Sequence, residues 1–186
     1  MKASVQTAAL TLCLCLSACG DHLGEYELED VRVVQALPPA AADGKVEPNG
    51  EYLRVELSSQ TSLYAAHTGP GLYTDADFCP LRNRDQLIAF EPIASDEKAV
   101  EDWKRRGALR QNPRDKRYHY FVYLVPSSPP RKLFTNSDDL IAGYDLRRQK
   151  RDICIRFFIP GYNIIPSRSD VVRIPAETLA SAFKAA

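Results

Sequence analysis

The first eighteen residues constrain this chain most, because they decide which part of it folds and in which compartment. Met1 and Lys2 are followed by 16 uncharged residues, 3–18, most of them small or apolar. A run of this length matches the core of a signal peptide and is shorter than the roughly 20 apolar residues that span a bilayer. We therefore expect residues 1–18 to be a signal peptide that is removed, leaving 168 residues to fold.

A short motif closes this apolar run. Leu16-Ser17-Ala18-Cys19 resembles the lipobox of bacterial lipoproteins, which has a branched apolar residue, two small residues and the cysteine that is lipidated. The resemblance implies that Cys19 carries acyl chains such as palmitate and anchors the protein in the cell envelope, since two or more chains give stable membrane attachment. By analogy with Gram-negative sorting, Gly20 implies the outer membrane, with the protein facing the periplasm.

The cysteines are easier to interpret once the signal peptide is set aside. Of the five, only Cys79 and Cys154 remain unmodified in the predicted mature protein. Two such cysteines in an oxidising compartment predict one disulfide bond. The bond would close a loop of about 75 residues, which chain-entropy arguments value at roughly 4 kcal/mol. Two buried thiols are the alternative, and the lack of a CxxC pattern argues against a redox catalyst.

The pattern of the remaining chain predicts a mainly β fold. Predicted strands cover residues 31–34, 52–58, 118–125, 153–159 and 171–174. In the segment 153–159, isoleucines alternate with Cys154, so the disulfide is expected on the face opposite the isoleucines. Residues 95–107, which include Trp103, and residues 176–184 are predicted helices. Without a βαβ rhythm, these elements indicate an antiparallel β-sandwich-like single domain with one or two peripheral helices.

The domain is expected to follow a short tether. Residues 19–29 are polar and acidic and are interpreted as a lipidated tether, and residues 30–186 as the single β-rich domain. Charge is unevenly distributed, with 17 acids and 6 bases in residues 20–102 and 17 bases and 7 acids in residues 103–186. Such asymmetry can orient a partner. We favour mutual neutralisation of the two halves in one fold, and the compartment disfavours nucleic-acid binding.

Few residues qualify as candidates for chemistry. His67, Asp75 and Asp77 are weak candidates for a metal site, but their spacing matches no metal-ligand pattern, so no metal and no cofactor is expected. His119 lies inside a predicted aromatic strand and is interpreted as a packed or edge histidine. Motifs for serine hydrolases, zinc proteases and nucleotide binding are missing, although a Ser-His-Asp site built from distant positions stays open.

Three surface features have a structural and a functional interpretation, and we favour the structural one for each. Seven bases within residues 104–117 suit an anionic partner or a solvated surface, and Asp138-Asp139 suits a turn or helix start better than an acid–base pair. Tyrosines suit either a recognition surface or β-sheet packing. They are Tyr64, Tyr73, Tyr118, Tyr120, Tyr123, Tyr144 and Tyr162.

These observations favour a non-enzymatic, envelope-anchored binding protein with a membrane contact through its lipid and a protein partner of unknown identity. One form, by analogy with other small lipoproteins, is an immunity-type inhibitor that neutralises a toxin in the periplasm. A structural lipoprotein of a secretion or envelope complex is the alternative. A periplasmic hydrolase is a second alternative and would need His67 or His119 beside a nucleophile or metal.

Overall fold

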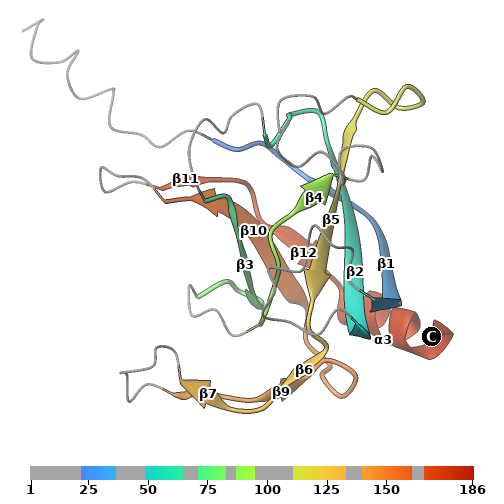
Figure 1. The fold of residues 1–186 in the computed structure, drawn as a ribbon, viewed down its shortest axis with the longest axis vertical. Helices are drawn as coiled ribbons and strands as arrows, with labels where there is room; N and C mark the ends of the chain where they lie inside the picture. Colours follow the sequence, from blue (N-terminus) through green and yellow to red (C-terminus); the bar gives the residue numbers. More distant parts are fainter. Residues whose placement is uncertain are drawn as a thin grey trace, which may run out of the picture.

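The computed structural model describes residues 22–36, 49–64, 71–82, 87–94, 111–132, 140–160 and 166–186. These residues form antiparallel sheets and a C-terminal helix, which confirms the predicted mainly β, sandwich-like fold (Figure 1). The predicted helix at 95–107, with Trp103, lies outside the described residues, as do Cys19 and His67. Across the described ranges, no helix is long and apolar enough to cross a membrane.

The first sheet has the order β1-β2-β5-β4, and all its pairs are antiparallel. Its strands are β1 (Glu27–Ala36), β2 (Asn49–Ser59), β5 (Tyr118–Leu124) and β4 (Ile93–Ala94). The alternation in β2 turns Leu53, Val55 and Leu57 into the core, while Arg54 and Glu56 lie on the outer face. A register shift between Leu28 and Asp30 leaves a bulge at Glu29.

The second sheet is built around β10 (Ile153–Ile159). Strand β3 (Tyr73–Phe78) pairs along one edge of β10, and β11 (Ser167–Arg168) and β12 (Val172–Ile174) pair along the other. Ile153, Ile155 and Phe157 are almost completely buried and face the first sheet's core residues. The sequence predicted β10 at its observed bounds but did not predict β3.

The C-terminal helix α3 (Ala176–Ala185) confirms the prediction for residues 176–184. It buries Leu179 and Ala182 in the core shared by the two sheets and packs beside β1. Asp152, at the start of β10, accepts a 2.9 Å hydrogen bond from the backbone nitrogen of Ala176. This contact satisfies one of the free N–H groups at the beginning of the helix.

The predicted tether boundary at Glu29 is wrong. Leu23 is fully buried, Tyr26 is nearly so, and β1 already begins at Glu27. The backbone nitrogen of Leu23 donates a 3.0 Å hydrogen bond to the carbonyl oxygen of Arg168 beside it. The acidic composition was misleading because the exposed glutamates alternate with apolar side chains that enter the core. The folded body therefore begins no later than His22, which forms a bridge with Arg168.

The disulfide between Cys79 and Cys154 confirms the prediction from the cysteine count. The sulfur atoms are 2.08 Å apart and the Cα atoms 5.1 Å apart. Cys79 directly follows β3 and Cys154 lies in β10, so the bond joins the two strands at one end of the sheet. Cys154 points away from the core-facing isoleucines Ile153 and Ile155, as the alternation predicted.

Candidate interaction surface

A two-stranded ribbon extends from the body at the end far from the chain's first described residues (Figure 1). It consists of β6 (Ser127–Ser128) paired with β9 (Tyr144–Asp145), and then β7 (Arg131–Lys132) paired with β8 (Leu140–Ile141). Neither pair is joined by a further strand, so the described part of the ribbon has open edges on both sides. Open strand edges present backbone donors and acceptors to a partner.

The base of this ribbon is fixed by Tyr144. Its buried hydroxyl oxygen accepts a hydrogen bond from the backbone nitrogen of Ile88 at 2.9 Å and donates one to the carbonyl oxygen of Val125 at 3.1 Å. Burial raises the pKa of Tyr144, which keeps the phenol protonated and able to donate. The ribbon therefore has a rigid attachment although most of its length is outside the core.

Gly143 allows the two strands of the ribbon to approach each other closely. A Cβ atom at this position would lie 2.8 Å from the Cδ of Pro130 and 2.9 Å from the carbonyl oxygen of Ser128. Both contacts are shorter than the van der Waals approach of such atoms, and both involve rigid groups. Only glycine fits at this position without a shift of the ribbon.

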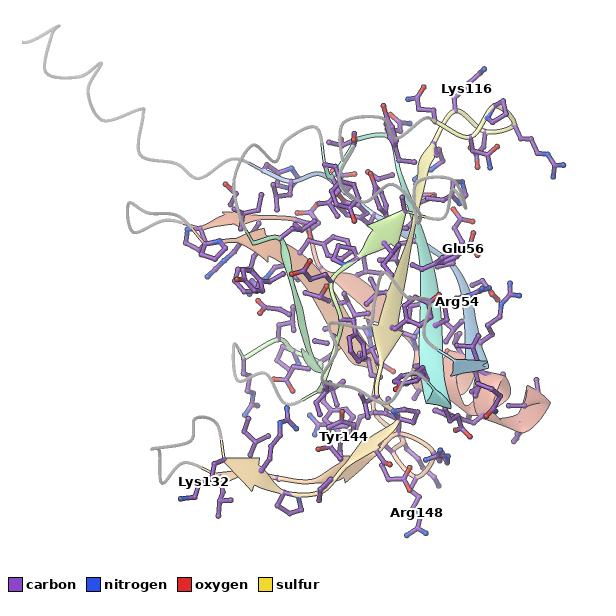
Figure 2. All side chains as sticks on the ribbon, in the orientation of Figure 1. Arg54, Glu56, Lys116, Lys132, Tyr144 and Arg148 are labelled. Carbon is purple, nitrogen blue, oxygen red and sulfur yellow. A yellow bond between two sulfur atoms is a disulfide. The ribbon has the colours of Figure 1, made fainter. Side chains whose placement is uncertain are left out.

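The ribbon combines an exposed apolar side chain with basic ones. Leu140 is 71% exposed, which is unusual for a leucine at a described position of this chain. Lys132 and Arg148 lie on the outside of the ribbon and of its base (Figure 2). Lys132 is directly opposite Leu140 in the β7–β8 pair. Residues 127–145 contain two bases and three acids, and residues 146–151 at the base of the ribbon add four bases. An exposed leucine beside polar and charged groups is the composition of a protein-binding site.

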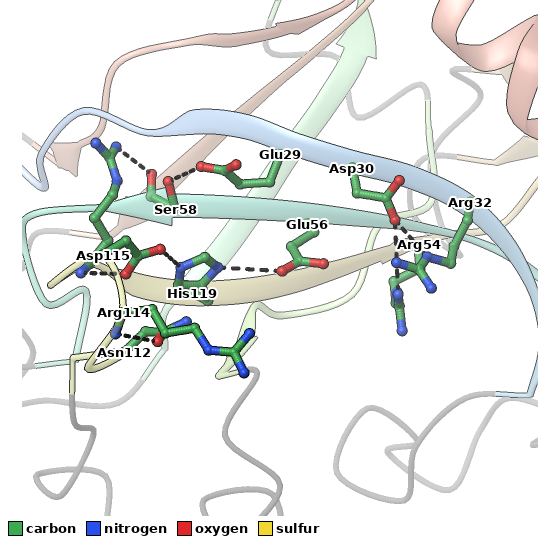
Figure 3. A network of polar contacts seen from close by, with 11 residues as sticks. Glu29, Asp30, Arg32, Arg54, Glu56, Ser58, Asn112, Arg114, Asp115 and His119 are labelled. Carbon is green, nitrogen blue, oxygen red and sulfur yellow. Dashed lines mark hydrogen bonds and ion pairs between the residues drawn. The ribbon is translucent and has the colours of Figure 1, made fainter.

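A second polar region covers the outer face of the first sheet (Figure 3). The ring of His119 lies between two carboxylates, with Nε2 2.7 Å from Oδ2 of Asp115 and Nδ1 3.3 Å from Oε1 of Glu56. Asp115 belongs to the turn before β5, and Glu56 comes from β2. The pKa of Asp115 is lowered because its carboxylate accepts the backbone N–H of Arg117 and a hydrogen bond from His119.

Ser58 lies beside His119 in the strand register but does not form a catalytic pair with it. Its hydroxyl donates to the carboxylate of Glu29, the bulged residue of β1. A nucleophilic serine needs its hydroxyl directed at a histidine nitrogen. Both ring nitrogens of His119 instead contact carboxylates, so this network links three strands and contains no activated nucleophile.

Asp75 and Asp77, the predicted weak metal ligands, lie side by side on β3 but are engaged by other groups. Asp75 forms a 2.6 Å ion pair with Arg156 of β10. Asp77 accepts hydrogen bonds from the backbone nitrogens of Phe78 and Arg82, and burial raises its pKa. The described residues contain no group of three or more side chains placed to hold a metal ion. Both aspartates have structural contacts here.

The other candidates are distributed over the fold. His22 lies 3.0 Å from Asp170, Arg114 lies in the turn before β5, and Lys116 and Arg117 follow that turn. Asp138, Asp139, Tyr162 and the bases 104–110 lie outside the described residues. Of the tyrosines, Tyr120, Tyr123 and Tyr144 are buried, as sheet packing predicts, whereas Tyr73 is 44% exposed.

Ion pairs connect the acidic first half of the chain to the basic second half. Arg117 lies 3.0 Å from Glu27, Arg156 lies 2.6 Å from Asp75, and Arg147 pairs with Glu51. These contacts support the interpretation that the halves neutralise each other in one fold.

The ribbon was not predicted from the sequence as an interaction surface. Its strands are two residues long and separated by Pro129-Pro130, so no alternation marks them.

Comparison of the chain with protein-family models, with curated proteins and with solved structures finds no match.

Proposed function

We propose that this chain is a lipid-anchored protein of the bacterial envelope that binds a protein partner without catalysing a reaction. The observation that carries the binding function is the projecting ribbon, with Leu140 exposed opposite Lys132. An exposed large apolar residue on a rigidly attached, open-edged ribbon has little structural use in the isolated protein. Apolar side chains surrounded by charge commonly form the centre of a protein–protein contact.

The proposed location is supported by two independent features. The motif ending at Cys19 resembles a lipobox, and the Cys79–Cys154 disulfide suits an oxidising compartment such as the periplasm. Gly20 favours the outer membrane. Lipid on Cys19 would then be the membrane contact, and the ribbon the protein contact.

Two forms of this function differ in the partner. An immunity-type inhibitor would place the ribbon against a toxin, and a structural lipoprotein would place it against a membrane complex. An inhibitor gains from a rigid, preformed contact element, and the Tyr144 anchorage provides one. We therefore favour the inhibitor. The arrangement of His119 and Ser58 gives the hydrolase alternative no support.

The binding function is tested by recovering partners from detergent-solubilised envelopes with tagged protein. Lys132→Glu and Leu140→Ser should each reduce the recovered partner at least tenfold, as expected for residues at the centre of an interface. Lys116→Glu is the matched control, because Lys116 is also an exposed lysine and lies at the opposite end of the molecule (Figure 2). A toxin supports the inhibitor and a membrane complex the structural form. The absence of any partner, or equal recovery by all variants, contradicts the proposal.

The anchor is tested separately. Cys19→Ala should abolish labelling by a palmitate analogue and leave the protein uncleaved or soluble. Unchanged labelling would refute lipidation at Cys19.

A further inference from the structure

The side of the molecule nearest the proposed lipid is defined by a row of four residues in register. Tyr73 of β3 is opposite Phe158 of β10, Phe158 is opposite Arg168 of β11, and Arg168 forms a bridge with His22. The row therefore runs across the strands at one end of the second sheet, from the exposed ring of Tyr73 to His22, the first described residue. Its members come from segments far apart in the sequence, but the sheet places them side by side.

The chain between Cys19 and His22 is too short to hold the body away from a membrane. Three residues of fully extended chain span at most about 11 Å. The headgroup region on one side of a bilayer is itself roughly 5–8 Å thick. Lipid inserted through Cys19 would therefore hold His22, and the sheet edge that pairs with it, at the membrane surface. This consequence follows from the correction of the tether, because a tether to Glu29 would have left the orientation free.

The side chains of the row suit a membrane surface. The rings of Tyr73 and Phe158 stack with centroids 5.4 Å apart, and Tyr73 is 44% exposed. Tyrosine is enriched at membrane interfaces, where its ring meets acyl chains and its hydroxyl meets water. Arg168 is exposed beside the stack and can bind lipid phosphate.

Two of the described carboxylates near this row already contact a basic side chain. Asp75, two residues after Tyr73 in β3, forms its ion pair with Arg156. Asp170, two residues beyond Arg168, lies 3.0 Å from His22. These pairs reduce the repulsion that free carboxylates would have with anionic phospholipids.

We propose that the row Tyr73–Phe158–Arg168–His22 contacts the phospholipid bilayer and orients the body with the ribbon directed away from the membrane. This inference rests on the proposed lipidation of Cys19. In Figure 1 the ribbon lies at the bottom of the view, whereas β11, which contributes Arg168 to the row, lies well above it. In this orientation the ribbon stays accessible to a partner in the periplasm while the row contacts lipid.

The orientation is tested with tryptophan reporters in lipidated, full-length mature protein. Tyr73→Trp and Leu140→Trp are incorporated into vesicles of phosphatidylethanolamine and phosphatidylglycerol, with or without brominated acyl chains that quench nearby indoles. Both variants and the unsubstituted protein contain Trp103 and share its background. Tyr73→Trp should lose emission in brominated vesicles beyond that background, and Leu140→Trp should not. Equal quenching of the two variants would overturn the orientation.

Two further measurements separate the possible failures. Mass spectrometry of the N-terminal peptide shows whether Cys19 carries lipid. Its absence would overturn the anchor and this orientation together, whereas lipid on Cys19 with equal quenching overturns the orientation alone. Phe158→Trp is a second reporter in the same stack in case the ring at position 73, which packs closely over Gly71, does not tolerate the larger indole. It should be quenched in the same way.

Discussion

The two sheets of this protein contain similar ion pairs but bury them to different depths. In the second sheet, Asp75 and Arg156 approach to 2.6 Å with 12% and 13% of their side chains exposed. On the outer face of the first sheet, Asp30 and Arg32 approach to 2.5 Å with 40% and 56% exposed. Almost equal distances therefore describe two physically different contacts. Water screens the exposed pair, whereas the buried pair has lost most of its hydration.

This difference suggests a division of roles between the sheets. The second sheet joins the Cys79–Cys154 disulfide, the buried Asp75–Arg156 pair and the segment from His22, so it holds the proposed anchor side in a fixed geometry. The outer face of the first sheet has exposed charges that can change without unfolding the protein. Four predictions test this division, beginning with the largest expected effect.

Loss of the disulfide should have the largest effect on stability. Replacing Cys79 and Cys154 together with serine should lower the free energy of unfolding by about 4 kcal/mol, because the unfolded chain regains the freedom of a long loop. Urea unfolding of the purified domain measures this loss, and reduction of the unsubstituted protein should reproduce it. An unchanged midpoint would show that the second sheet does not depend on its covalent link.

Asp75→Asn should lower the free energy of unfolding by about 3 kcal/mol, because Arg156 stays buried without its carboxylate. Asp30→Asn is the matched control on the first sheet and should cost less than about 1 kcal/mol. Both substitutions remove one negative charge and keep the size of the side chain. Equal shifts in the urea midpoint would contradict the comparison of the two sheets.

The dependence of stability on pH should have opposite signs at two aspartates near the disulfide. Burial raises the pKa of Asp77 above its ordinary value of 3.8. The pKa of Asp152 is lowered, because its carboxylate accepts the backbone N–H of Ala176 and a hydrogen bond from Arg173. As pH rises from the ordinary pKa through the raised pKa of Asp77, the fold therefore loses stability at this residue. It gains stability through Asp152, and this gain is lost as pH falls through the lowered pKa.

Asp77→Asn should accordingly raise the melting temperature at about pH 7 relative to the unsubstituted protein, with the difference shrinking towards about pH 3. Asp152→Asn should lower it at neutral pH, with a difference that also shrinks at acid pH. Thermal unfolding followed by circular dichroism over this range measures both profiles. If both substitutions change the melting temperature in the same direction at neutral pH, burial does not dominate the pKa of Asp77.

Strands could be predicted from the sequence where only one of their two faces is buried. Strands β2 and β10 were predicted because a single buried face imposes a two-residue period on the sequence. Strand β3 was missed because Asp75 and Asp77 are buried beside apolar neighbours, which removes the period. Residues 22–29 were misinterpreted for the opposite reason, since acidic composition concealed the buried Leu23 and Tyr26.

The candidate surfaces were less predictable than the fold. The disulfide followed from counting cysteines, because Cys79 and Cys154 are the two that lie outside the proposed signal peptide and lipidation motif. Asp115 is four residues from His119 and could have been found by spacing, but Glu56 meets His119 only through the register of β2 and β5. The ribbon depends on the pairing of very short strands and on the close approach at Gly143, neither of which leaves a periodic signal.

The smallest predicted effect concerns His119, which is the intermediate case in the comparison. Its side chain is only 13% exposed, as little as Arg156, but its partners Glu56 and Asp115 are 22% and 39% exposed. If the hydration of the carboxylates decides the energy, His119→Gln should cost less than about 1 kcal/mol. A double-mutant cycle with Glu56→Gln should then give a coupling energy of roughly 0.5 kcal/mol by urea unfolding. A coupling close to the loss in Asp75→Asn would show that burial of one partner is sufficient, and the outer face would then be as structural as the second sheet.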